Sequence, residues 1–280
     1  MRLRPSSQSR PPTFYASINH GDPGLAQKRG VGVCKRRAGM VAKRRKRSDE
    51  DAAAPGVPTE IGAAGKEWMV MQLHGYFRSS AAYRVRIALN IKGLKVEHLP
   101  HHLRRNEQRA PDYLAINPQG LVPALVLDDG VVLTQSLAII EWIDETYPDP
   151  PLQAKTALVR ARIRAFALAI ACDIHPVQNL KVLSRLRTLG IDEKQVTEWA
   201  AWANAEGLAA CEKLVANEAG PFCFGAGPTL ADICLIPQLA NARRFGVDVS
   251  AFPRLLQIEA ACNALDAFQA AAPANQPDAE

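Results

Sequence analysis

Several features of secreted, membrane and metal-binding proteins are missing from this sequence of 280 residues. No stretch approaches about 18 uncharged apolar residues, so we expect no membrane span. No apolar core of about 7–15 residues follows the first arginines, which argues against a secretory signal. The six cysteines show no CxxC spacing, and four of them lie in apolar or helical runs. This usage indicates a reduced, cytoplasmic chain rather than a disulfide framework.

The body of the chain also lacks basic character. The net charge is +6, but residues 1–70 hold 14 Lys and Arg against 6 Asp and Glu, which leaves 20 against 22 for residues 71–280. A near-neutral body argues against nucleic-acid binding. The histidines His98, His101 and His102 have neither a cysteine partner nor metal-ligand spacing. We therefore predict a solvated strand end there and no metal site.

Residues 1–70 show no apolar periodicity. They are rich in Pro, Gly, Ser and Arg and include the basic run 43–47, so we predict a disordered extension. Three explanations stay open. The translation start is assigned too early, since Met69 and Met71 stand at the start of the first predicted strand; or the segment is a disordered tail; or it is a targeting or nucleic-acid tag.

Residues 71–151 alternate between strand and helix periods, which predicts a small α/β unit. The predicted strands are 71–76, 95–102, 124–127 and 131–133, and the predicted helices are 80–92, 107–115 and 136–146. Residues 152–280 show helical periods alone, at 154–172, 176–188, 193–217, 229–244 and 252–269. Thr229 and Asp232 have the spacing of a capping box, so we assign Asp232 a structural role.

Two short segments carry candidate chemistry. Ser79 and Ser80 stand where a strand passes into a helix. There their hydroxyls can cap the helix, and the positive end of the helix favours an anion such as a thiolate. Pro123 precedes a predicted strand, and either bond isomer is open: a cis bond would present the Val122 backbone to a ligand.

The strings RSSAAYRVRIAL, INPQGLVPAL, TQSLAIIEWIDETYP, DIHPVQNLKVL and LADICLIPQLANARRFGVD resemble the zeta class of glutathione transferases. That class comprises the maleylacetoacetate isomerases and the maleylpyruvate isomerases, and the resemblance runs from about residue 71 to residue 277. It implies a thioredoxin-like N-terminal domain at 71–151, an all-α C-terminal domain at 152–280 and the glutathione transferase fold. It also implies a homodimer, with glutathione as cofactor and a small dicarboxylate as substrate.

The resemblance also assigns site residues. Ser79 and Ser80 match the serine pair at the glutathione sulfur, and Arg78 and Arg244 would anchor the substrate carboxylates. Glutathione-contacting positions match Gln108, Val122, Gln135, Ser136 and Gln178, with His175 and Asn179 beside them. Many members of the class have a cysteine after the two serines, whereas this chain has Ala81. No protein thiol can therefore act at this turn. Arg84 and Arg86, inside the first helix, are expected to serve structure or the dimer interface.

The expected activity is the glutathione-dependent cis–trans isomerisation of maleylacetoacetate to fumarylacetoacetate in aromatic amino-acid catabolism. One alternative is a maleylpyruvate isomerase of gentisate catabolism. Another is a zeta-type transferase or dehalogenase of small α-halo acids, which would consume glutathione. A binding or scaffold protein of the same fold is disfavoured, because such a protein would be expected to have lost the serine pair and the Gln135–Ser136 pair.

Overall fold

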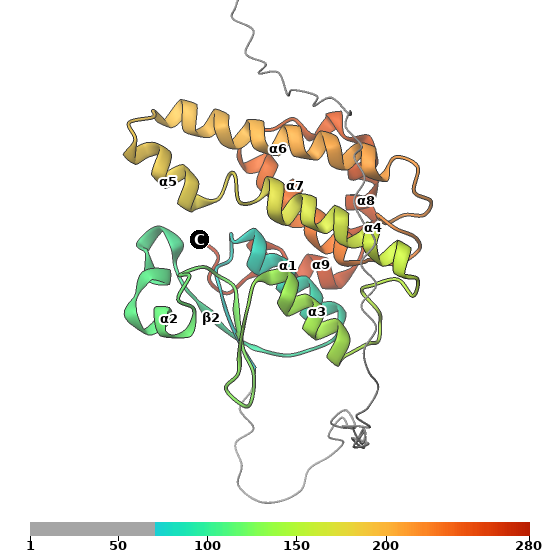
Figure 1. The fold of residues 1–280 in the computed structure, drawn as a ribbon, viewed down its shortest axis with the longest axis horizontal. Helices are drawn as coiled ribbons and strands as arrows, with labels where there is room; N and C mark the ends of the chain where they lie inside the picture. Colours follow the sequence, from blue (N-terminus) through green and yellow to red (C-terminus); the bar gives the residue numbers. More distant parts are fainter. Residues whose placement is uncertain (1–70) are drawn as a thin grey trace, which may run out of the picture. The chain divides into compact units, whose positions relative to one another are not determined.

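The computed structural model describes residues 71–280, so the expectations for residues 1–70 lie outside the described residues. A mixed sheet of four strands forms the lower part of the molecule in Figure 1, in the order β2-β1-β3-β4. Strand β1 pairs with β2 in parallel and with β3 antiparallel, and β3 pairs antiparallel with β4. The strands are β1 Gln72–Gly75, β2 Glu97–Pro100, β3 Ala124–Val126 and β4 Val132–Thr134.

Three helices accompany the sheet, namely α1 Ser80–Ile91, α2 Pro111–Ile116 and α3 Ser136–Thr146. Helices α1 and α3 pack against each other, and α1 also touches α7 and α9 of the helical part. The predicted strands and helices of this half are confirmed, with the first three strands shorter than predicted and the fourth displaced by one residue. The segment predicted as a helix at 107–115 is a 3-10 turn at Glu107–Arg109 followed by α2.

The rest of the chain is helical. It contains α4 Ala157–Leu168, a π-helical turn Ala169–Ile174, α5 Leu180–Thr188, α6 Glu193–Val215, α7 Leu230–Arg244, α8 Pro253–Asn263 and α9 Asp266–Ala271. Helix α7 is almost entirely buried, and both hydrogen bonds of the predicted capping box at Thr229 and Asp232 are present. The structural role of Asp232 is thereby confirmed.

One continuous hydrophobic core joins the two halves. It extends from Leu73 and Leu125 in the sheet through α1 and α3 to buried side chains of α4, α6, α7, α8 and α9. Because α1 lies in the middle of this core, its first turn is fixed relative to the helical part as well as to the sheet. The division of the chain into domains at residue 151 stays a prediction.

Two of the predicted helices are wrong in extent. The helix predicted at 252–269 is interrupted where Leu265 adopts an extended conformation (φ −98°, ψ 128°). The interruption lets α8 pack on α6 and α7 while α9 packs on α1. The helix predicted at 176–188 begins only at Leu180, because Asn179 caps it: its Oδ1 accepts a hydrogen bond from the Lys181 N–H at 3.1 Å.

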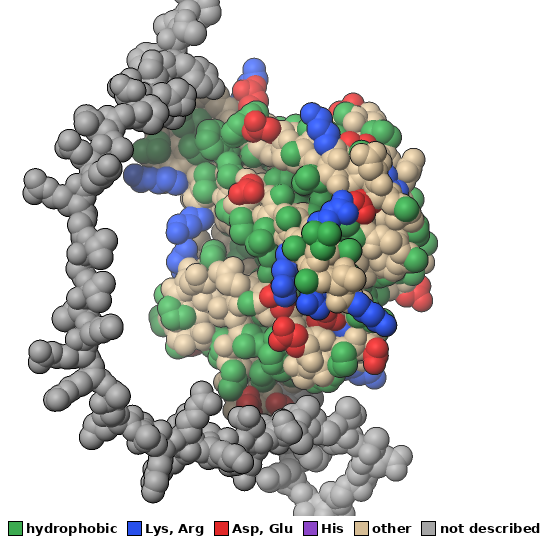
Figure 2. Space-filling model, turned by 45° about the vertical axis from the view of Figure 1, so that its right-hand side comes forward, with side chains coloured by type: hydrophobic (Ala, Val, Ile, Leu, Met, Phe, Trp, Pro, Cys, Tyr) green, Lys and Arg blue, Asp and Glu red, His purple; other side chains and the backbone are tan. Residues whose placement is uncertain are grey.

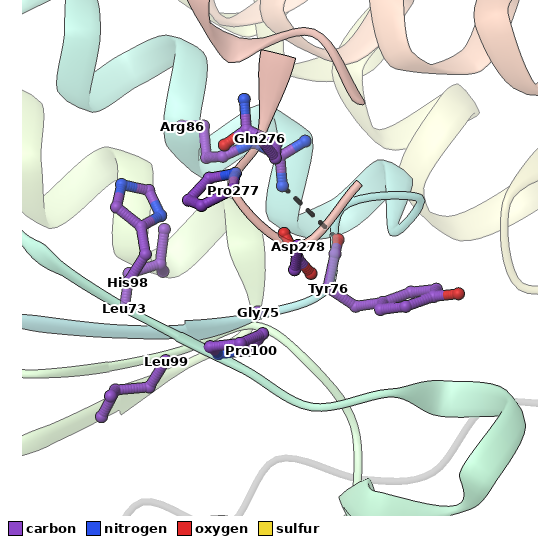
Figure 3. A pocket seen from close by; sticks show the side chains of 10 residues that line it. All are labelled: Leu73, Gly75, Tyr76, Arg86, His98, Leu99, Pro100, Gln276, Pro277 and Asp278. Carbon is purple, nitrogen blue, oxygen red and sulfur yellow. Dashed lines mark hydrogen bonds between the residues drawn. The ribbon is translucent and has the colours of Figure 1, made fainter. Parts of the chain in front are cut away.

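The last residues return to the end of β1. The Phe77 N–H donates to the Asp278 carboxylate at 3.0 Å. Gln276, Pro277 and Asp278 line a cavity of about 230 Å³ over β1 and β2, shown in Figure 3. Beside them the buried Arg86 donates to the backbone carbonyls of Tyr76, Phe77 and Ala271. Arg86 therefore joins α1, the strand end and α9, as its expected structural role requires.

Candidate functional site

Ser79 and Ser80 occupy different positions at the start of α1. Ser79 precedes the helix, and its Oγ accepts a hydrogen bond from the Ala82 N–H at 3.2 Å, so the predicted N-cap is confirmed. Ser80 is the first helical residue, is buried, and lines a cavity. A hydroxyl that accepts one hydrogen bond keeps its own proton to donate. Both serines therefore remain able to stabilise a thiolate.

The cavity lies between the first turn of α1 and the last turn of α7 and has a volume of about 320 Å³. It brings together Arg78, Ser80 and Arg244, which lie far apart in the sequence. Each arginine stacks on the ring of its neighbour, Arg78 on Phe77 and Arg244 on Phe245, with the guanidinium carbon 4.8 Å and 5.0 Å from the ring centroid. Stacking of this kind holds a guanidinium in place while its edge stays free for an anion.

The two arginines give the cavity a positive field. Burial and the nearby Arg78 and Arg104 lower the pKa of Arg244. Arg244 also donates to the Asn241 Oδ1 at 2.6 Å, which fixes its direction. The adjacent Arg243 behaves differently, because it forms two hydrogen bonds of 2.5 Å with Glu259 on α8. Of the two neighbouring arginines, only Arg244 lines the cavity.

The acidic tail reaches the same cavity. Glu280 is the one acidic side chain among the described residues that line it. Its Oε1 lies 3.1 Å from the His102 Nε2 and 3.5 Å from the Arg105 Nη2. Asp278 and Glu280 were not predicted as site residues, since nothing in the sequence shows where the chain end returns. Asp278 contacts the turn after β1, and Glu280 contacts residues that follow β2.

A second group of predicted residues surrounds the loop before β3. Gly120 has a positive φ of 57°, and a Cβ there would lie 2.7 Å from the Arg109 guanidinium, so the loop packs closely on the turn that carries Gln108. The buried Gln108 Oε1 has no hydrogen-bond partner among the described residues. The Val122–Pro123 peptide bond is cis. No hydrogen bond joins the Val122 backbone N–H or C=O to another part of residues 71–280.

The N-terminus of α3 is the third component. Gln135 has a φ of 69°, which is rare for a residue with a side chain. It provides no side-chain cap for α3, and its Nε2 donates to the Gln119 Oε1 at 2.9 Å. Ser136 is buried as the first residue of α3. Helix N-terminal N–H groups without a cap favour an anion.

His175, Gln178 and Asn179 lie in the turn between the π-helical segment and α5. Burial, with Arg84 and Arg244 nearby, lowers the pKa of His175 to about 3, so its imidazole is neutral at physiological pH. Gln178 is buried. Asn179 caps α5, and its Nδ2 lies 3.3 Å from the His175 Nε2. A capping role for Asn179 could have been predicted, because asparagine is among the preferred N-cap residues.

Of the clustered histidines, His98 on β2 is exposed as predicted, whereas His101, the first residue after β2, is half-buried. The His101 ring stacks on His74, with 2.8 Å between the His74 Nδ1 and the His101 Nε2, and both pack against Tyr113. The Tyr113 hydroxyl donates to the Leu121 carbonyl at 2.6 Å, beside Val122. The predicted solvated strand end is therefore wrong for His101, which supports the loop before β3.

Within residues 71–280, no group of three or more His, Cys, Asp or Glu side chains is arranged to hold a metal ion. No helix of this part has both the length and the apolar character needed to cross a membrane. The five cysteines that the structure describes are free, four of them buried and Cys172 exposed.

Comparison with known proteins gives a consistent result. A family model described as the N-terminal domain of glutathione S-transferase matches residues 73–151. The maleylacetoacetate isomerase of Pseudomonas aeruginosa is 50% identical over 210 residues, which is 74% of this chain and 98% of that protein. The maleylpyruvate isomerase of a Ralstonia species is 47% identical over 212 residues, 74% of this chain and 99% of that protein. The structure of a maleylacetoacetate isomerase from Methylobacterium extorquens AM1 with bound malonate and glutathione has a TM-score of 0.73 at 42% identity and covers 75% of this chain and 99% of that one.

Proposed function

Because this chain belongs to the glutathione transferase family of maleylacetoacetate and maleylpyruvate isomerases, we propose that it isomerises maleylacetoacetate to fumarylacetoacetate with glutathione as cofactor. The expected family and fold class are confirmed. The observation that carries the proposal is the cavity shared by Arg78, Ser80 and Arg244. In this cavity, the turn that carries Ser80 can stabilise a thiolate, and the two arginines can bind a dicarboxylate.

The residues around the cavity fit glutathione. The uncapped end of α3 with Ser136 suits a carboxylate. The unpaired backbone groups of Val122 can pair with a peptide as an added strand does. The buried Gln108 Oε1 lacks a donor. We propose that Gln135 and Gln178 also contact glutathione and that His175 and Asn179 support this wall of the site.

When bound, glutathione supplies a thiol whose reversible addition to the double bond of a cis enedioate permits rotation about that bond. The protein must keep this thiol ionised at neutral pH, although an ordinary thiol has a pKa of about 8.5. Lowering the pKa by two units requires about 2.7 kcal/mol. A hydroxyl bond from Ser79 or Ser80, about 1.5–3 kcal/mol, and the N-terminus of α1, about 0.3–1 kcal/mol, are sufficient.

Arg78 and Arg244 are proposed to hold the substrate. Planar guanidinium groups match carboxylates in geometry and charge. Their positive field also favours the negative charge that develops on the substrate oxygen when a nucleophile adds to the conjugated double bond. Both effects act without a protein thiol, which agrees with Ala81 at the position after the serines.

The test is an assay with purified protein, maleylacetoacetate and glutathione, in which product formation and total free thiol are measured together. We expect fumarylacetoacetate to form only when glutathione is present, while the free thiol concentration stays constant. Conversion without glutathione would contradict the proposal, and so would stoichiometric loss of thiol, the behaviour of a transferase or dehalogenase.

Maleylpyruvate is the second candidate substrate, because the maleylpyruvate isomerase of Ralstonia is nearly as similar to this chain as the first relative. The same assay with both compounds decides between them. The substrate with the higher kcat/KM places the enzyme in aromatic amino-acid catabolism or in gentisate catabolism.

We also propose a homodimer in the cytoplasm. The edge strand β4 and the segment before it expose Val131 and Val132, and α4 exposes Leu158, which supports burial of these side chains against a second copy. Free cysteines support a reducing compartment. We propose no nucleic-acid partner, since both signs of charge are interspersed on the face shown in Figure 2. Sedimentation equilibrium would test the dimer.

A further inference from the structure

Arg84 is a buried cation without a counter-ion. It lies in α1, one turn after Ser80, and only 2% of its surface is exposed. Its Nη1 donates to the Ser136 Oγ at 3.4 Å. Its Nε and Nη2 have no hydrogen-bond partner among the described residues. A charge buried in this way is expected to destabilise a fold unless something compensates it.

The groups around Arg84 offer no compensation. No ion pair joins Arg84 to an acidic residue within residues 71–280. Its ionisable neighbours are His175, Cys172 and Cys234, and burial lowers the pKa of Arg84. The end of α3 that carries Ser136 is the positive end of that helix and lacks a side-chain cap. The Arg84 guanidinium and the positive end of α3 therefore meet at Ser136, and a bound anion would compensate both positive charges.

Other buried cations of α1 are fully paired. The Lys92 side chain, at the C-terminal end of the helix, is completely buried, but its Nζ donates to the Asp144 carboxylate and to the carbonyls of Tyr147 and Pro150. Arg86 donates to three carbonyls. The fold thus satisfies cations where their role is structural, which makes Arg84 an exception.

We propose that Arg84 is a positioning residue for glutathione, acting through the Ser136 hydroxyl on the γ-glutamyl carboxylate. The inference rests on the proposed glutathione site at the start of α3. A donor from Arg84 occupies one lone pair of the Ser136 Oγ and leaves the hydroxyl proton for the carboxylate. The buried guanidinium acquires its counter-charge, the γ-glutamyl carboxylate, only when glutathione is bound. Without glutathione, the enzyme is therefore less stable than a variant with an apolar residue at this position.

The test measures glutathione affinity by calorimetry and the unfolding temperature without glutathione. In Arg84→Met we expect the Kd for glutathione to rise about ten- to hundredfold, the range for a lost charge-assisted bond. The unfolding temperature should stay unchanged or rise, because an apolar residue in place of a buried charge is often neutral or stabilising. Arg84→Lys keeps the charge and should give an intermediate Kd. The control Lys92→Met should unfold at a lower temperature with an unchanged Kd.

A lower unfolding temperature for Arg84→Met with an unchanged Kd would show that Arg84 is only structural and would overturn the inference. An equal rise in Kd for Lys92→Met would also overturn it, since the effect would not be specific. If Ser136→Ala binds glutathione as the wild type does, the inference fails while the isomerase proposal stands. If the wild type itself does not bind glutathione, the proposed function fails first.

Discussion

Replacement of Arg244 by alanine tests how the helical part contributes to substrate binding. Arg244 lines the cavity at the end of α7, and its Nη2 donates a hydrogen bond to the Asn241 Oδ1. The other N–H groups of the guanidinium remain available to a substrate carboxylate. A charge-assisted hydrogen bond contributes about 1.5–3 kcal/mol. Because the residue remains partly exposed, solvent screens the interaction, and we take about 2 kcal/mol.

A loss of about 2 kcal/mol in transition-state stabilisation corresponds to a decrease of roughly 30-fold in kcat/KM for the substrate. The KM for glutathione should change little, since the proposed glutathione site lies mostly on the α/β half and Arg244 is not among its proposed residues. Arg244→Lys should recover little activity, because an ammonium group cannot form the two parallel bonds of a guanidinium. Steady-state kinetics with each substrate varied in turn provides both constants.

Arg243→Ala is the matched control. Arg243 is the adjacent residue, carries the same charge, and pairs with Glu259 instead of lining the cavity. We expect its kcat/KM to stay within about twofold of the wild type, since isolated surface pairs contribute about 0–1 kcal/mol to stability and none of this acts on the substrate. Wild-type kcat/KM in Arg244→Ala, or equal losses in both variants, would refute the assignment and direct attention to Arg78.

Four further outcomes are expected. Ser79→Ala or Ser80→Ala should slow isomerisation about 10- to 100-fold and raise the thiol pKa of bound glutathione, measured by thiolate absorbance. Ser79→Ala should in addition lower stability by about 0.5–2 kcal/mol through loss of the cap. Wild-type rates in both variants would show that the serines serve only as helix caps. A chain of residues 69–280 should keep full glutathione-dependent activity, and loss of activity would show that the segment before it is required. Asp278→Ala should lower the unfolding temperature and kcat/KM together, while Asp278→Asn, which keeps an acceptor, should not. His175 should make the free energy of unfolding fall with decreasing pH between about 6.5 and about 3, because the unfolded chain binds a proton at His175 that the folded chain does not. His175→Gln should reduce this pH dependence, measured by denaturant titrations at several pH values. An unchanged pH dependence would contradict the assignment.

The elements that were predicted well are those whose signals are local. The N-cap at Ser79 and the capping box at Thr229 and Asp232 depend on residues three or four positions apart, and both are present. The strand after Pro123 is a short apolar run next to a strong turn signal, and it forms β3. The two helix caps are decided by hydrogen bonds that close within one turn of the chain, and β3 follows from the short turn that pairs it with β4.

The features that were missed depend on distant contacts. No Gly or Pro marks the break at Leu265; α9 leaves the line of α8 because the α1 surface is where it packs. The return of Asp278 to the Phe77 N–H spans 201 residues. Arg84 reads in the sequence as an ordinary helical arginine, and only the fold shows that nothing neutralises it.

The position of α1 explains why the site needs both halves of the molecule. Ser80 and Arg84 are four residues apart, which places them on one face of α1, and that face meets α3 and α7. Most of the residues proposed to bind glutathione therefore belong to the sheet half, where α3 and the loop before β3 lie, and Gln178 is proposed to add a contact from the helical half. The cavity wall beyond the thiol is formed by α7 and by the tail around Glu280. Differences in substrate between related isomerases are accordingly expected in α7 and the tail, which can change without disturbing the residues that bind and ionise glutathione.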